Sequence, residues 1–132
     1  MELQKRERII IRPNYRNTLR NVYLEPYRAA IEAGVGTVMA SFNEVNGVPA
    51  TASRWLLTDI LRKEWGFTGF VVSDYTGINE LVPHGVAKDE KQAAELAVNA
   101  GVDMDMTGAT YIKYLSKLVK EGKVSEKTID NA

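Results

Sequence analysis

The sequence predicts an α/β fold, namely about half of a TIM-type parallel β/α barrel. Predicted helices and short apolar strands alternate along the chain, which favours parallel strands joined by helical crossovers. The chain has 132 residues, whereas a complete eight-stranded barrel needs about 250 residues. The last predicted helix runs to Ala132 without a capping residue, so we expect a fragment or a shortened, engineered chain.

The N-terminal part of the sequence predicts one helix. From Thr18 onward apolar residues follow a helical spacing, and the main helix is expected from about Glu25 to Gly34, a glycine suited to a C-terminal cap. Before it, Ile9–Ile11 favour a short strand, which the following Arg-Pro pair ends. Residues 1–17 otherwise predict no clear element.

Two strands and the helix between them follow. Residues 36–43 and 69–74 are apolar, β-rich runs and predict buried strands. Ser53 is a candidate cap for the intervening helix, which Gly66 ends. Asn46-Gly47 predicts the turn ahead of that helix.

The C-terminal third of the sequence predicts one more helix and strand, followed by two helices. Asp89 and Gln92 have the spacing of a capping box, and Gly101 ends the helix that they begin. The remaining predicted elements are a strand at 102–106 and helices at 110–121 and 125–132.

The composition excludes several classes of protein. Seventeen Lys and Arg offset seventeen Asp and Glu, which argues against a dedicated surface for nucleic acid or anionic membrane. There is no cysteine and one histidine, His84, so thiolate and multi-histidine metal sites are excluded. We expect no cofactor and no metal. No apolar run approaches the length of a membrane span, and the sequence assigns no compartment.

The stretch from Gly69 to Tyr75 carries the strongest functional signal. An apolar strand there ends on an acid, Asp74, which an aromatic residue follows. In parallel α/β folds the reacting groups lie at the carboxyl ends of the strands. An aspartate at this point, beside an aromatic platform, predicts a nucleophile or base that faces a polar ring such as a sugar. The alternative is a helix-capping or turn-forming aspartate.

Several motifs, taken together and in order, resemble glycoside hydrolase family 3, the family of β-glucosidases, β-xylosidases and β-N-acetylglucosaminidases. They are Val35–Asn43, Asn46–Ala50, Trp55–Leu57, Trp65–Phe70 and Val72–Asp74. The resemblance is closest to bacterial periplasmic β-glucosidases. It covers residues 18–132, which we take as a partial barrel domain, whereas residues 1–17 match poorly.

The resemblance implies roles for four residues. Asp74 matches the nucleophile, which forms a covalent glycosyl-enzyme and retains stereochemistry on terminal β-D-glucosides. Met39 matches a residue that lines the glucose pocket. Phe42 stands where many members have a tyrosine that contacts the nucleophile, so one hydrogen bond to Asp74 is lost. Tyr75 stands where tryptophan is usual and still offers a smaller stacking surface.

Other parts of the family's machinery are missing from this sequence. The family's first barrel half carries an aspartate, arginines and a Lys-His pair that grip the sugar, and the acid/base comes from a following domain or an inserted loop. One carboxylate cannot both attack the sugar and protonate the leaving oxygen. We therefore expect the chain alone to be inactive and the complete enzyme, plausibly periplasmic or secreted, to act on a β-linked glucoside or oligosaccharide.

Two further hypotheses belong to other classes. One is a non-catalytic or engineered half-barrel that folds and forms oligomers, and the other is a small α/β binding domain unrelated to sugars. Open strand edges and an uncovered inner face favour a partner, either a second copy or the missing barrel half. Alternatively, the N-terminal segment with Ile9–Ile11 covers the sheet.

The remaining polar and aromatic residues have ordinary explanations as well. Asp103 and Asp105 alternate with apolar residues and share one side of their strand. One hypothesis is that they form a carboxylate pair with Asp74 or hold a cation. The favoured alternative is that both residues line a pocket or face solvent. Glu44 is expected as a solvated loop charge, with a ligand contact as the alternative, and a loop-surface or turn position is favoured over a catalytic role for His84. Trp55 and Trp65 are expected to pack, as are the residues of one helical face, Tyr111, Tyr114, Leu115 and Leu118.

Overall fold

The computed structural model describes residues 15–132, so the strand predicted at Ile9–Ile11 lies outside the described residues. The elements are, in chain order, α1 (Tyr15–Thr18), η1 (Leu19–Tyr23), α2 (Glu25–Glu32), β1 (Thr37–Ala40), β2 (Glu44–Val45), β3 (Val48–Pro49), η2 (Ala50–Ala52), η3 (Trp55–Glu64), β4 (Phe70–Ser73), η4 (Asn79–Leu81), α3 (Glu90–Ala100), α4 (Thr110–Lys120) and α5 (Glu126–Asp130). Over this range no helix is both long and apolar enough to cross a membrane.

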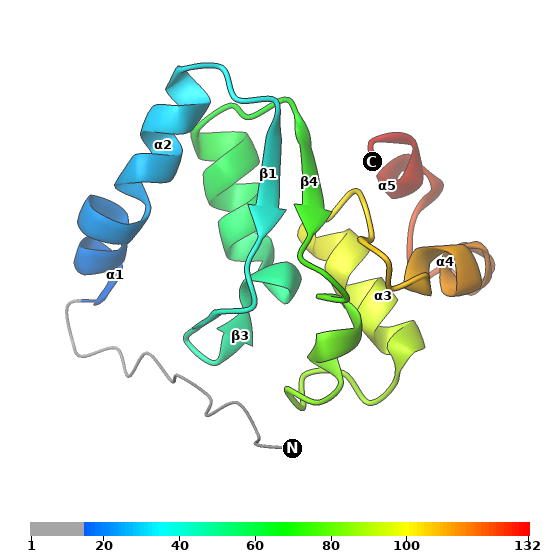
Figure 1. Cartoon of the computed structure of the whole chain (residues 1–132). Coiled ribbons are helices and arrows are strands. Elements are labelled where there is room, and N and C mark those ends of the chain that lie inside the picture. The colour runs from blue at the N-terminus through cyan, green and yellow to red at the C-terminus, as the bar shows by residue number, and fades with distance from the viewer. Residues whose placement is uncertain (1–14) are drawn as a thin grey trace.

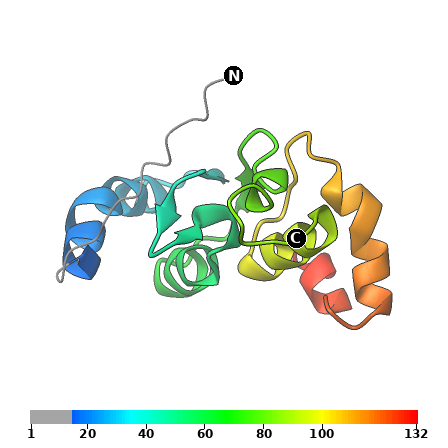
Figure 2. The same cartoon turned by 90° about the horizontal axis from the view of Figure 1, so that it is seen from below.

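Strands β1 and β4 form a parallel pair. This pairing confirms the predicted α/β class with parallel strands. The register pairs Val38 with Val71 and Met39 with Val72. On its other side β4 makes a single parallel bridge, between Val72 and Met104. Strand β4 is therefore central, and helices η3 and α3 lie on one side of the strands (Figures 1 and 2).

The strand predicted at 102–106 is wrong in its extent, because only Met104 bridges to β4. The ladder is interrupted because side chains occupy its donors. The amide of Val71 donates to the Asp103 carboxylate at 2.7 Å, and the amide of Met106 donates to the Ser73 hydroxyl at 2.9 Å. The segment thus follows β4 without forming a regular strand.

Two apolar clusters hold the helices together. The larger one joins η3, the outer side of the strands and α3, and it includes Leu57, Val71 and Ala97. The smaller one joins α3 to the last two helices through Val98 and Leu118. Tyr111, Tyr114 and Leu115 pack against this second cluster, which confirms the predicted core face of α4.

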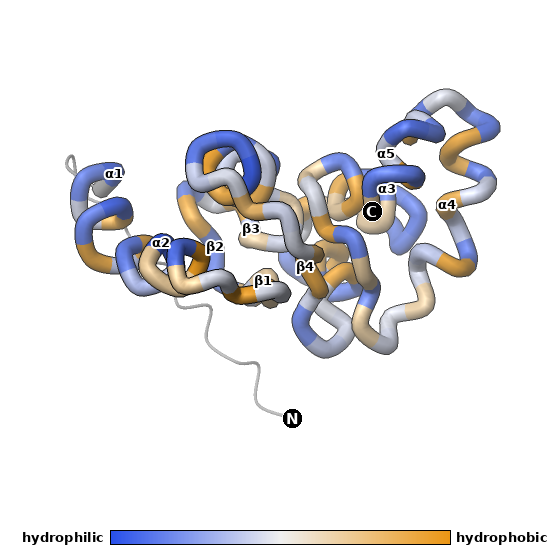
Figure 3. The backbone as a smooth tube through the Cα atoms, turned by 90° about the horizontal axis from the view of Figure 1, so that it is seen from above, coloured by the Kyte–Doolittle hydropathy of each residue, from blue (hydrophilic) through white to orange (hydrophobic). Residues whose placement is uncertain are grey.

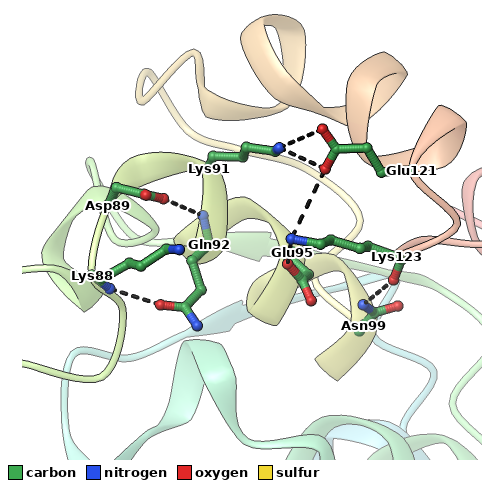
Figure 4. A network of polar contacts seen from close by, with 8 residues as sticks. All are labelled: Lys88, Asp89, Lys91, Gln92, Glu95, Asn99, Glu121 and Lys123. Carbon is green, nitrogen blue, oxygen red and sulfur yellow. Dashed lines mark hydrogen bonds and ion pairs between the residues drawn. The ribbon is translucent and has the colours of Figure 1, made fainter.

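Helices begin and end at the residues that the sequence predicts as caps. The Asp89 carboxylate accepts from the amide of Gln92 at 2.8 Å, while the Gln92 side chain accepts from the amide of Lys88 at 2.8 Å (Figure 4). Gly101 ends α3 with a φ of 110°, a value that favours glycine. Ser53 accepts from the amide of Leu56 at 3.3 Å near the start of η3.

The predicted turn at Asn46-Gly47 is a hairpin. Both residues have positive φ, 57° and 76°, as a two-residue turn between antiparallel strands requires. Strands β2 and β3 pair across it. This hairpin stands between β1 and η3 at the carboxyl end of the sheet (Figure 1).

Candidate active site

Asp74 directly follows the central strand β4 and is half-buried. Its Oδ1 accepts a hydrogen bond from the amide of Tyr75 at 2.7 Å, the one such bond that the described residues give the carboxylate. The backbone carbonyl of Asp74 accepts from the amide of Gly77 at 2.8 Å. The backbone therefore fixes this turn and holds one of the two carboxylate oxygens.

Ser73 and Thr76 flank this turn, and the sequence patterns did not single them out. Ser73 is fully buried, and its hydroxyl donates to the carbonyl of Asp74 at 2.9 Å. Thr76 has a φ of 53°, a strained value for a β-branched residue. Its amide donates to the carbonyl of Met106 at 3.0 Å. Strain in such a turn persists only where its surroundings impose it, and a threonine in the sequence does not signal it.

The three predicted sugar-binding residues are all accessible. Met39 is 48% exposed on β1, Phe42 is 40% exposed two residues beyond that strand, and Tyr75 is 64% exposed beside Asp74. Met39 pairs in register with Val72, two residues before Asp74. The structure thus brings these residues to neighbouring strands and their carboxyl ends.

Glu44 and His84 form a pair that the sequence analysis did not anticipate. The Nδ1 atom of His84 lies 2.8 Å from Oε1 of Glu44, and the two side chains are 23% and 18% exposed. The expectation of a solvated loop charge is therefore wrong for Glu44, which lies in β2 and is 18% exposed, whereas His84 lies in a turn, as expected. Forty positions separate them in the chain, so no local pattern could have joined them. Their contact ties the β2–β3 hairpin to the loop after η4.

Asp103 and Asp105 have structural partners and are not joined to Asp74 by any hydrogen bond. Asp103 pairs with the guanidinium of Arg62 and accepts from the amide of Val71. Asp105 accepts from the amide and hydroxyl of Thr110 at 2.6 and 2.8 Å, at the start of α4. A solvent-facing position is thus wrong for Asp103, whose side chain is 11% exposed. Each of the two carboxylates accepts hydrogen bonds from the fold around it, and a pocket-lining position stays a prediction.

Two buried oxygens near this turn lack a hydrogen-bond donor, Oδ1 of Asn79 and Oδ1 of Asp105. Both lie against the α-carbon of Gly108, where an added Cβ would stand 2.2 and 2.5 Å from them. Any side chain at position 108 would therefore have to displace both oxygens. Over residues 15–132 there is no group of three or more His, Cys, Asp and Glu side chains that could hold a metal ion.

Trp65 packs against the core, as predicted. Trp55 is partly buried and lines a hollow of about 230 Å³ beside the hairpin, together with Arg16, Val45, Asn46, Val48 and Ser53. The guanidinium carbon of Arg16 lies 5.8 Å from the centre of the Trp55 ring. Asp74 does not line this hollow, so the candidate active site lies elsewhere.

Comparison with known proteins identifies the class to which this fold and site belong. Residues 7–132 match the Glycosyl hydrolase family 3 N terminal domain. The chain is a member of glycoside hydrolase family 3, a family of hydrolases, as the resemblance implied. A small α/β domain unrelated to such enzymes is therefore not supported.

The individual proteins similar to this chain include β-glucosidases and a β-xylosidase. The chain is 50% identical over 112 residues to the periplasmic beta-glucosidase of Salmonella typhimurium, covering 85% of this chain and 15% of that protein. It is 51% identical over 90 residues to a beta-xylosidase of Formosa agariphila, covering 67% and 12%. A beta-glucosidase from Listeria innocua, solved in complex with glucose, superposes with a TM-score of 0.78 at 45% identity, covering 80% and 15%. The chain spans about 15% of the length of the first of these relatives.

Proposed function

We propose that this chain is the nucleophile-bearing part, about half of the barrel, of a retaining β-glucosidase. Family membership supports the reaction class, and beta-glucosidases among the similar proteins support a terminal β-D-glucoside as the substrate class. The observation that carries the proposal is the position of Asp74, directly after the central parallel strand. Residues 18–132 form the barrel part in this proposal.

In the proposed reaction a carboxylate oxygen of Asp74 attacks the anomeric carbon of the glucoside. The bond from that carbon to the leaving oxygen breaks, and the leaving oxygen takes a proton from an acid that lies outside this chain. Water then hydrolyses the ester and regenerates the carboxylate. The amide of Tyr75, which donates to Oδ1, orients the carboxylate for this attack.

Exposed side chains around Asp74 suit a sugar ring in this proposal. Tyr75 offers an aromatic face for stacking, Met39 contacts the ring, and Phe42 occupies the position beside the nucleophile. Met39 and Phe42 lie on or just beyond β1, which pairs with β4. The reaction class requires neither a cofactor nor a metal. The name of the Salmonella relative supports a periplasmic or secreted place for the complete enzyme.

A chimera tests this proposal. Residues 18–132 replace the matching segment of the Salmonella relative, and turnover is measured on an aryl β-glucoside. We expect activity in the chimera, a loss of at least about 10³-fold with Asp74→Ala, and a covalent label on Asp74 after treatment with a 2-fluoro glucoside. Asp130→Ala, at an exposed carboxylate of α5, is the matched control.

The intact chain alone is the second arm of the experiment. It is expected to show no turnover, because a missing general acid alone removes about 10²–10⁴-fold of the rate. Turnover by the chain alone that Asp74→Ala abolishes would contradict the proposed incompleteness. An active chimera that is insensitive to Asp74→Ala would overturn the nucleophile assignment.

A further inference from the structure

Ser73 is a polar residue buried at the end of an apolar strand. It closes β4 after Phe70, Val71 and Val72 and is 0% exposed. Figure 3 shows hydrophobic stretches along both β1 and β4. Burying a hydroxyl away from water is unfavourable unless the group finds hydrogen-bond partners. The partners of the Ser73 hydroxyl therefore indicate what this residue does.

The Ser73 hydroxyl both donates and accepts a hydrogen bond. It donates to the carbonyl of Asp74 at 2.9 Å, and it accepts from the amide of Met106 at 2.9 Å. The first bond lies within the turn that carries the candidate nucleophile, whereas the second reaches a segment 33 positions later in the chain. One side chain thus joins the Asp74 peptide to the segment beside β4.

Met106 also holds the other side of this turn. Its carbonyl accepts from the amide of Thr76 at 3.0 Å, so its two backbone groups bind the turn on either side of Asp74. Thr76 has a φ of 53°, a conformation that persists only where surrounding contacts impose it. The bond to Met106 is such a contact.

The remaining bonds of the turn are local. The carbonyl of Asp74 also accepts from the amide of Gly77 at 2.8 Å, and the Asp74 carboxylate accepts from the amide of Tyr75 at 2.7 Å. These two bonds fix the shape of the turn, whereas the bonds to Met106 fix its position relative to the sheet. Since Ser73 is fully buried among the described residues, its hydrogen bonds are complete within this chain.

We propose, given the nucleophile role proposed for Asp74, that Ser73 is a positioning residue for this nucleophile. Its hydroxyl holds the turn against Met106 and thereby sets the distance and angle at which the carboxylate meets the anomeric carbon. Because Ser73 is buried, it acts through the backbone and not on the sugar. Such attack depends steeply on placement, and an error of about 1 Å costs on the order of 10²-fold in rate.

Ser73→Ala tests this role in the chimera described above, because it removes the hydroxyl and little volume. On the aryl β-glucoside, kcat and kcat/KM are expected to fall equally, by about 10²-fold. Labelling of Asp74 by the 2-fluoro glucoside is expected to slow by a similar factor. Ser73→Thr keeps a hydroxyl at this position and is expected to stay within about tenfold of the native rate.

Thr58→Val is the matched control, because it removes another partly buried hydroxyl that donates to a backbone carbonyl. Thr58 lies in η3 and donates to the carbonyl of Ala100, at the end of α3, at 2.8 Å. In the full chain its urea midpoint is expected to fall about as much as that of Ser73→Ala. In the chimera Thr58→Val is expected to leave kcat and labelling unchanged.

Hydrogen exchange of the full chain supplies a readout that needs no catalysis. Ser73→Ala is expected to accelerate exchange at residues 74–77 and 104–107, because the amide of Met106 loses its acceptor, whereas Thr58→Val leaves both segments unchanged. Unchanged exchange there in Ser73→Ala would overturn the inference whatever the activity.

Turnover separates a failure of this inference from a failure of the proposed function. If Asp74→Ala abolishes turnover but Ser73→Ala leaves it intact, the nucleophile stands and the positioning role is overturned. Equal losses of kcat in Ser73→Ala and Thr58→Val, or in Ser73→Ala and Ser73→Thr, would overturn the positioning role as well. An active chimera that is insensitive to Asp74→Ala would overturn the proposed function and the positioning role together.

Discussion

Gly69 lies directly before β4, where the chain passes Gly36 at the start of β1. A Cβ at Gly69 would stand 2.1 Å from the carbonyl oxygen of Gly36 and 2.7 Å from the ring of Phe67. Neither the Gly36 backbone nor the Phe67 ring can shift without disturbing the fold, because the first directly precedes the neighbouring strand and the second is 5% exposed. Glycine at this position is therefore required by close approach between the two strands.

Gly69→Ala is expected to lower the free energy of unfolding by ~1–3 kcal/mol, the usual cost of overpacking. Gly36→Ala is the matched control, because a Cβ there meets nothing within 4 Å, and it is expected to change stability by less than about 0.5 kcal/mol. Urea unfolding followed by circular dichroism measures both. Equal midpoints for the two variants would contradict this account of the strand contact.

Asp103 joins β4 to η3 through one carboxylate. It accepts from the amide of Val71, which is fully buried, and pairs with Arg62, whose guanidinium also donates to the carbonyl of Gly69 at 3.0 Å. The Asp103 side chain is 11% exposed and that of Arg62 is 26% exposed. Removing the acid leaves a buried amide and a mostly buried cation without their acceptor.

Asp103→Ala is expected to destabilise the chain by about 2–3 kcal/mol, below the range for a fully buried pair because water reaches Arg62. The control is Asp59→Ala, which removes an exposed ion pair with Lys63 and is expected to leave the urea midpoint unchanged within error. If the two substitutions have the same effect, Asp103 does not hold the strand to the helix.

At the scale of the elements, the sequence predicts the helices and the first two strands well, because their signals are local. Asp89, Gly101 and the Asn46-Gly47 pair each fix the backbone within a few residues. The limits of the segment 102–106 depend on long-range contacts instead, since the Asp103 carboxylate and the Ser73 hydroxyl occupy the ladder donors. The Glu44–His84 pair was not predictable for the same reason.

Helix α4 is attached to this segment by Tyr111, whose hydroxyl donates to the carbonyl of Val102 at 2.7 Å. Burial, followed by the nearby negative charges of Asp105 and Asp103, raises the pKa of Tyr111 well above its ordinary value of about 10. The folded state therefore holds this proton more tightly than the unfolded state. The stability that results is fully present below pH 10 and is lost as the pH rises toward the raised pKa.

Alkaline titration is expected to separate Tyr111 from the other five tyrosines. Its tyrosinate absorbance should appear only together with the loss of helical circular dichroism. Tyr111→Phe removes the hydroxyl, so this variant is expected to be less stable at pH 7, through the lost hydrogen bond, but to lose less further stability above pH 10. A Tyr111 that ionises at pH 10 in the folded chain would contradict the burial argument.

At the scale of the whole molecule, stability is unevenly distributed. Helix α3 contributes Ala93 and Ala97 to the first apolar cluster and Ala94 and Val98 to the second, so it joins the two. In contrast, η1 and α2 contain no buried residue. They are held through the half-buried Ile31 and by an exposed ion pair between Arg20 and Glu64, which contributes little.

Hydrogen exchange is expected to reveal this difference directly. Amides of residues 28–33 should exchange at least about tenfold faster than those of α3, because a helix without buried apolar surface opens locally without unfolding the clusters. Arg20→Ala should accelerate exchange in η1 and α2 by no more than about fivefold, because the ion pair is exposed, and should leave α3 unchanged, since the pair joins only η1 to η3. Mass spectrometry of proteolytic peptides resolves the two regions. Equal protection in α2 and α3 would contradict this uneven distribution of stability.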